Sequence, residues 1–159
     1  MRVTIRLAVH EAKWLAHVQS VAGSMPGLVP VVKGNGYGFG RAWLINEASS
    51  RGARDVAVGT VFEMGDAVGL GVRPLVLTPS LDLDSVRVPK GAVLTVGSDV
   101  QLDHLLAHVP LGAVMVKVAT RVRRHGFDPD RLGAVVERVR SSGLDLHSLS
   151  IHPPIKGDD

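Results

Sequence analysis

Short valine-rich runs alternate with helical segments along the chain, and this alternation is the strongest constraint on its fold. Apolar runs of up to seven residues cover residues 28–32, 55–60, 74–78, 92–97 and 112–118, with a weaker run at 144–151. Runs of this length are typical of strands that are buried on both faces of a parallel sheet. Because strand and helix follow each other about every 20 to 30 residues, the sequence predicts an α/β protein with right-handed crossovers.

Helical spacing is clearest over residues 128–140, which carry recognisable start and stop signals. Asp128 suits the N-cap, Pro129 suits the first turn, and Gly143 lies where a left-handed stop residue belongs. Ser98 is expected to open another helix. Two further helices are expected over residues 10–22 and 41–50.

Six strands and their helices fit two arrangements. One is an open doubly wound sheet, and the other is part of an eight-stranded (β/α) barrel, whose usual length of about 250 residues exceeds the 159 of this chain. Because proline cannot donate a ladder hydrogen bond, Pro30 is expected at the entrance of the first strand.

Composition excludes several kinds of chemistry. The absence of cysteine rules out disulfides, thiolate zinc sites and cysteine nucleophiles, and the seven histidines show no metal-type spacing with carboxylates, so no metal site is expected. The net charge of +3 is spread along the chain, which argues against a nucleic-acid partner. The apolar runs are too short to span a membrane, and the N-terminus lacks an export-signal pattern, so we expect a cytoplasmic protein.

Residues 31–40 read VVKGNGYGFG, a strand-like run that ends in Lys33 and continues with glycine at every second position. This spacing matches neither the dinucleotide fingerprint nor a P-loop. A lysine at the C-terminal end of a central strand points its amine into a low-dielectric mouth, where the neutral form is favoured and can form a Schiff base. The glycines allow close approach of a flat ligand or phosphate, and Tyr37 offers a phenol at the rim. The competing interpretation is a surface lysine that closes a strand before a flexible turn.

The same ten residues resemble the pyridoxal-phosphate attachment motif of alanine racemases, in which lysine, asparagine, tyrosine and glycines recur in a similar arrangement. The likeness covers most of the chain, because residues 4–18 resemble the segment before the barrel and residues 59–63 and 74–77 resemble later strand ends. A second cluster contains Lys117, residues 119–122, Arg124 and Gly126-Phe127. Relatives have Asp-Thr-Gly-Met where this chain has Ala-Thr-Arg-Val at residues 119–122.

The resemblance implies a fold, a cofactor and a set of site residues. It implies a parallel (β/α) barrel with pyridoxal 5'-phosphate, with Lys33 as the catalytic residue and Lys33, Tyr37, Arg124 and His152 as cofactor-binding residues. Arg124 is implied to lie beside the cofactor's ring hydroxyl and the substrate carboxylate, oriented by Lys117, which is carbamylated in some relatives. His152 corresponds to a histidine near the pyridine ring.

The resemblance also implies that parts of the family's architecture are missing. About six of the eight barrel strands are expected, without the C-terminal β domain through which the partner subunit supplies a tyrosine to the second face of the substrate. We therefore expect one truncated domain over residues 1–159, with a pre-barrel strand and helix at 1–24 and barrel units at 25–159. Such a chain is expected to be weakly active or inactive alone, with a small amino acid as substrate and a homo-oligomer or a complementing C-terminal half as partner.

Three other interpretations stay open at this point. The chain could racemise an amino acid other than alanine, which the departures at Ala119, Arg121 and Val122 favour. It could be a non-catalytic pyridoxal-phosphate-binding protein, or an inert structural domain. A panel of amino acids separates alanine from other substrates, and an absorbance change with the cofactor separates the binding proteins from the inert domain.

Overall fold

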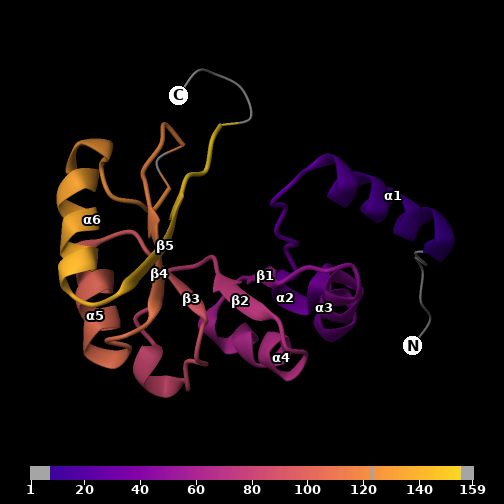
Figure 1. The fold of residues 1–159 in the computed structure, drawn as a ribbon, viewed down its shortest axis with the longest axis horizontal. Helices are drawn as coiled ribbons and strands as arrows, with labels where there is room; N and C mark the ends of the chain where they lie inside the picture. Colours follow the sequence, from indigo (N-terminus) through magenta and orange to yellow (C-terminus); the bar gives the residue numbers. More distant parts are fainter. Residues whose placement is uncertain (1–7, 123, 155–159) are drawn as a thin grey trace, which may run out of the picture.

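The computed structural model describes residues 8–122 and 124–154 (Figure 1). Part of the expected pre-barrel segment, residues 1–7, lies outside the described residues. The described chain forms a sheet of five parallel strands whose spatial order follows the sequence. They are β1 (Asp55–Val58), β2 (Arg73–Val76), β3 (Val93–Val96), β4 (Ala113–Lys117) and β5 (Asp145–Ser150). The predicted α/β class with a parallel sheet is therefore confirmed.

The helices include the four that the sequence predicts. These are α1 (Glu11–Ser24), α3 (Arg41–Ser50), α5 (Asp99–His108) and α6 (Leu132–Ser141). The Ser98 hydroxyl caps α5 as expected, accepting from the Gln101 amide at 3.4 Å. The Asp128 carboxylate accepts from the Asp130 amide at 3.2 Å and so caps a 3-10 turn, Pro129–Arg131, that leads into α6. Two short helices, α2 (Lys33–Gly36) and α4 (Met64–Gly69), were not predicted.

Residues 28–32, expected as the first strand, form only an isolated parallel bridge between Val31 and Ala57. The Val32 amide donates to the Ala57 carbonyl, and the Ala57 amide donates to the Pro30 carbonyl, each at 2.8 Å. Pro30 has no amide hydrogen with which to extend this pairing backwards. The segment therefore lies along the edge of β1 as an incipient strand, so the prediction of a full strand is wrong.

Alternate residues of the strands face two sides of the sheet. One side carries most of the core: Val58, Val76, Val96 and Val116 are all buried against helices that include Ile45, Leu102 and Val139. The other side carries a smaller buried cluster of Leu75, Val93 and Met115. Such burial on both faces explains why the strands read as continuous apolar runs in the sequence.

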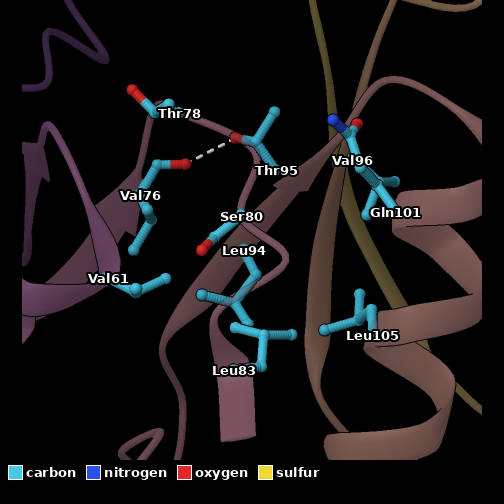
Figure 2. Close-up of a pocket in the computed structure, with 10 residues that line it drawn as sticks. All are labelled: Val61, Val76, Thr78, Ser80, Leu83, Leu94, Thr95, Val96, Gln101 and Leu105. Carbon is cyan, nitrogen blue, oxygen red and sulfur yellow. Dashed lines mark hydrogen bonds between the residues drawn. The ribbon is translucent and has the colours of Figure 1, made fainter. Parts of the chain in front are cut away.

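The middle of the sheet is closely packed. The buried Thr95 hydroxyl donates to the Val76 carbonyl at 2.5 Å, which satisfies a polar group within the apolar surroundings (Figure 2). The neighbouring cavity, near the ends of β2 and β3, has a volume of only about 10 Å³. It has room for about one water molecule and not for a cofactor ring.

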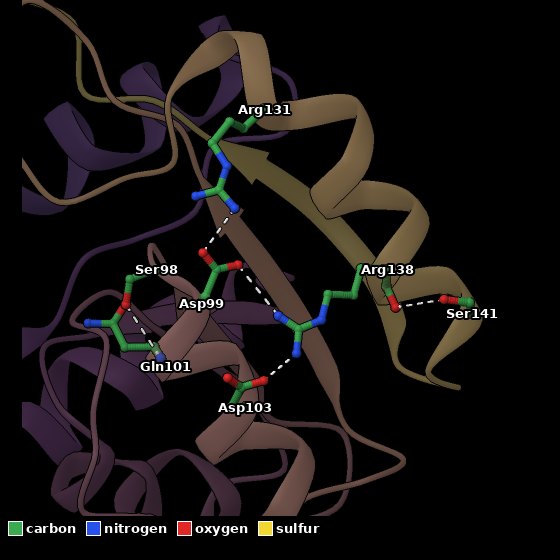
Figure 3. Close-up of polar contacts among 7 residues, drawn as sticks. All are labelled: Ser98, Asp99, Gln101, Asp103, Arg131, Arg138 and Ser141. Carbon is green, nitrogen blue, oxygen red and sulfur yellow. Dashed lines mark hydrogen bonds and ion pairs between the residues drawn. The ribbon is translucent and has the colours of Figure 1, made fainter.

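Helices α5 and α6 are joined on their outer side by a charged network (Figure 3). Arg138 pairs with both Asp99 and Asp103, and Arg131 reaches Asp99 at 2.9 Å. All four side chains are well exposed, so this network adds modestly to the apolar packing beneath it.

Helix α1 stands apart from the sheet, at the opposite end of the molecule from α5 and α6 (Figure 1). None of its residues is buried. Its Trp14 ring stacks on Phe39 at 5.6 Å and lies 5.3 Å from Trp43, measured between ring centroids. These three aromatic residues, which we call the aromatic cluster, attach α1 to α3 and to the segment before it. In the described part of the chain, no helix is long and apolar enough to cross a membrane.

Candidate functional site

The sequence-predicted site residues lie at or just after the carboxyl ends of β4, β5 and the bridged segment before Lys33. Strands of a parallel sheet end at the same edge, so the residues that follow them share one rim. Lys33 follows the bridge at Val31, Lys117 ends β4, Arg124 lies in the loop after it, and His152 follows β5. The topology thus places the candidates on one side of the molecule.

Lys33 occupies this rim beside β1 but is not sheltered. It is the first residue of α2, and its side chain is exposed. The prediction that the Lys33 amine lies in low-dielectric surroundings at the end of a central strand is therefore wrong for the described residues. The physical reason is the position of Val31 at the sheet edge: in the described chain, no further strand pairs with its outer side and covers the lysine.

The glycine-rich turn after Lys33 has an unusual backbone. Gly34 adopts φ 63° and ψ −137°, a conformation that a side chain makes costly, and Tyr37 is the one non-glycine residue among those described with a positive φ, at 55°. Tyr37 is 63% exposed, so its side chain contacts solvent.

Two charged residues that the sequence analysis did not identify hold this turn. One Glu63 oxygen accepts from the Gly34 amide at 3.1 Å and from the Gly59 amide at 2.8 Å. Arg41 donates to the Gly34 carbonyl at 2.6 Å and also pairs with Asp66 at 2.6 Å. The only signal in the sequence was the likeness of residues 59–63 to a family strand end, which assigns no role to Glu63.

Arg124 and His152 meet at the other end of the rim. An Arg124 guanidinium nitrogen lies 3.3 Å from His152 Nε2, and the Thr120 hydroxyl donates to the His152 carbonyl at 2.7 Å. Both side chains are exposed. The four predicted residues therefore form two groups, Lys33 with Tyr37 and Arg124 with His152, and in the described chain no hydrogen bond or ion pair joins the groups.

The loop that carries Arg124 is fixed by close backbone contact. The Ala119 amide donates to the Phe127 carbonyl and the Phe127 amide to the Lys117 carbonyl, each at 2.8 Å. A Cβ on Gly126 would lie 2.4 Å from the Ala119 nitrogen, closer than any side chain allows. This glycine therefore lets the loop fold back on the end of β4.

Lys117 is the last residue of β4, where its carbonyl accepts from the loop, and it is half-buried. Burial, and after it the charge of Arg124, lowers the pKa of the Lys117 amine from its ordinary value of 10.5. The amine is thus a more readily neutralised group than a surface lysine, and it adjoins the arginine that the sequence analysis associated with it.

Two larger hollows adjoin the glycine-rich turn. A mainly apolar groove of about 600 Å³ runs between α1 and the segment before Lys33, with Tyr37 and Phe39 in its wall. An open hollow of about 420 Å³ is lined by Gly34, Asn35, Arg41 and their neighbours. Backbone and aromatic groups of the turn therefore line a hollow on each of two sides.

Comparisons with known proteins point to one family. The family model described as alanine racemase, N-terminal domain, matches residues 8–159. A comparison with curated protein sequences found no match.

Solved structures of racemases share this fold. Alanine racemase from E. faecalis superposes with a TM-score of 0.76 at 25% identity, over 89% of this chain and 42% of its own. The biosynthetic alanine racemase from Pseudomonas aeruginosa gives 0.71 at 22% identity, over 90% and 42%. Histidine racemase from Leuconostoc mesenteroides subsp. sake gives 0.69 at 19% identity, over 89% and 40%. The chain thus spans about two fifths of the length of these proteins.

Proposed function

The chain belongs to the alanine racemase family through its N-terminal barrel domain, and on that premise we propose that it is the pyridoxal-phosphate-binding part of an amino-acid racemase. The observation that carries this proposal is the position of Lys33. The family match runs through the whole glycine-rich motif, and its lysine lies at the carboxyl rim of a parallel sheet, where ligands of such folds bind.

The glycine at the end of β1 leaves room for Lys33 itself. A Cβ on Gly59, at the end of β1, would lie 3.2 Å from the Lys33 Cβ and 3.1 Å from a Glu63 oxygen. The bare glycine therefore leaves the stem of the lysine room beside the strand end. Figure 1 shows β1 next to α2 at this edge.

Each candidate residue has a role that its chemistry supports. The Lys33 amine is the group that condenses with an aldehyde, and the bound cofactor would supply an electron sink for the α-carbon of an amino acid. The planar Arg124 guanidinium suits a carboxylate or a ring oxygen, with His152 limiting its orientation from 3.3 Å away. Tyr37 offers a phenol that can donate or accept at the same rim.

The solvent exposure of the candidate residues leads us to expect low activity from the chain alone. Lys33, Tyr37 and Arg124 all face solvent in the described chain, so water competes for every polar contact that they make. Exclusion of water strengthens such contacts in working sites. We therefore propose that the chain alone turns over slowly or not at all, and that a second copy or a complementing C-terminal half would complete the site.

Alanine is the first substrate to test, with D-alanine as the product of the L-isomer. Racemisation of another amino acid is the second candidate, because Ala119 and Arg121 replace the residues that the family motif has before Arg124. The expected cytoplasmic location is part of the same proposal.

The first experiment asks whether Lys33 takes the cofactor. The chain contains five lysines, so borohydride reduction after incubation with pyridoxal phosphate, followed by peptide mass mapping, reports on each of them. We expect the pyridoxyl group mainly on Lys33 and much less on the exposed Lys13 and Lys90. The absorbance that the lysine Schiff base adds to that of free pyridoxal phosphate should disappear in Lys33→Ala and persist in the matched variant Lys90→Ala. An even spread of label over the exposed lysines would refute the cofactor assignment.

A second experiment separates an enzyme from a cofactor carrier. The protein loaded with cofactor is incubated in deuterated water with a panel of L-amino acids, and exchange of the α-hydrogen is followed by NMR. Slow exchange with one or a few amino acids supports a racemase. Labelled Lys33 without any exchange would mean that the chain on its own binds the cofactor without catalysis.

A further inference from the structure

The residue after the proposed cofactor lysine is held through both of its polar backbone groups. The Gly34 amide donates to Glu63 at 3.1 Å, and the Gly34 carbonyl accepts from Arg41 at 2.6 Å. Both partners are charged, and hydrogen bonds to charged groups are about twice as strong as neutral ones. The two contacts come from opposite sides of one residue, so together they restrict rotation at both ends of it.

Gly34 needs such restraint because of its conformation. With φ 63° and ψ −137°, it has a conformation that glycine adopts at no steric cost. Glycine also has other conformations of similar energy, so sterics alone do not hold it in this one. If the two partners were absent, the turn could relax toward other conformations and carry Lys33 with it. A fixed Gly34 therefore means a fixed starting direction for the Lys33 side chain.

Glu63 also connects this turn to the sheet. The same oxygen that accepts from Gly34 accepts from the Gly59 amide at 2.8 Å, directly after β1. The Glu63 side chain is only 15% exposed, and Arg41 lies 4.0 Å from it while pairing with Asp66. The carboxylate therefore ties the lysine turn to a rigid strand end in a site that is partly shielded from water.

We propose that Glu63 and Arg41 are positioning residues, which set the direction of Lys33 by holding the amide and the carbonyl of Gly34. The assignment rests on the proposed function of Lys33, although the restraint itself does not need the cofactor. Neither residue touches the lysine amine by any contact in the described chain, so both act through the backbone.

The first arm of the test uses the full chain without cofactor. Amide exchange measured by NMR should be roughly ten- to hundredfold faster at Gly34 and Gly59 in Glu63→Ala than in the original protein. Glu63→Gln keeps an acceptor oxygen and should restore most of the protection. Exchange at Val116, in the middle of β4, should stay unchanged, whereas general destabilisation would accelerate it as well. Glu137→Ala, an exposed site on α6, is the matched control.

The second arm measures the direction of Lys33 by its reactivity. The ratio of pyridoxyl label on Lys33 to label on Lys90 should fall about tenfold in Glu63→Ala and in Arg41→Lys, whose ammonium lacks the planar fork of the guanidinium. Glu63→Gln should recover the ratio, and its pH profile should follow that of the original protein. An unchanged ratio in Glu63→Ala, with selective labelling in the original protein, would overturn the positioning role.

The two arms distinguish failure of the proposed function from failure of the positioning role. If the original protein shows no preference for Lys33, the proposed function fails, and the exchange arm alone decides whether Glu63 holds Gly34. If Gly34 exchange is the same in Glu63→Ala and in the original protein, the restraint is refuted whatever the labelling shows.

Discussion

Replacement of Gly126 by alanine is expected to be among the most damaging small changes in this chain. The added Cβ would lie 2.4 Å from the Ala119 nitrogen and 2.5 Å from the Val118 carbonyl carbon. Both atoms belong to the backbone at the end of β4, so no side chain can rotate to make room. The loop must move away from the strand instead.

The cost follows from the contacts that this movement breaks. The two 2.8 Å hydrogen bonds between Phe127 and the segment 117–119 contribute about 1 kcal/mol each. Residual crowding adds roughly 1–3 kcal/mol. We therefore expect Gly126→Ala to lower the free energy of unfolding by about 3–5 kcal/mol, a large part of the roughly 5–15 kcal/mol typical of a domain.

Urea denaturation followed by circular dichroism measures this loss. Gly133→Ala is the matched control, because the residue is within α6 and no atom outside its own helix backbone lies within 4 Å of its added Cβ. Alanine is the better helix former, so this control should be neutral or more stable by up to about 1 kcal/mol. A Gly126→Ala variant within 1 kcal/mol of the original protein would refute the steric argument.

Two further predictions concern charged groups. The pKa of Lys117 is lowered by burial and then by Arg124, so the folded state gives up this proton at lower pH than the unfolded chain does. Stability should therefore rise with pH in the range just below 10.5 and then level off, and urea midpoints at several pH values should show no such rise in Lys117→Met. Arg138→Ala removes the exposed pairs with Asp99 and Asp103, and it should cost about 1 kcal/mol or less, with the loss shrinking in high salt. A loss that salt does not change would point to packing by the arginine stem instead.

Local signals in the sequence were sufficient for much of the fold. Asp128, Ser98 and Gly143 act over three or four residues, so their effect on helix ends can be read without knowing the tertiary structure. The valine-rich runs are equally direct, because burial on both faces leaves no polar positions within them. Residues 28–32 carry the same signal, yet Pro30 has no amide hydrogen with which to extend the pairing, so they form only a bridge to Ala57.

The candidate site was less accessible from the sequence. The residues of the site were predicted through the family resemblance. The exposure of Lys33, however, depends on whether another strand pairs with the outer side of Val31, and no local sequence pattern encodes that. Glu63 and Arg41 were missed for a related reason. Glu63 is 29 residues from Gly34, with β1 between them in the sequence, and Arg41 is seven residues from Gly34, at the start of the next helix. A glutamate just after a strand end can have many structural roles, and only the three-dimensional structure shows that Glu63 contacts the turn at Gly34.

The aromatic cluster makes the protein's fluorescence a local signal. Both tryptophans of the chain belong to it, and Phe39 connects them to the glycine-rich turn. Emission at tryptophan wavelengths therefore reports whether α1 is docked on the turn next to Lys33, and it is nearly blind to β3, β4 and β5. An experimenter who compares this emission with far-ultraviolet dichroism during denaturation can see directly whether the two ends of the molecule melt together or in succession.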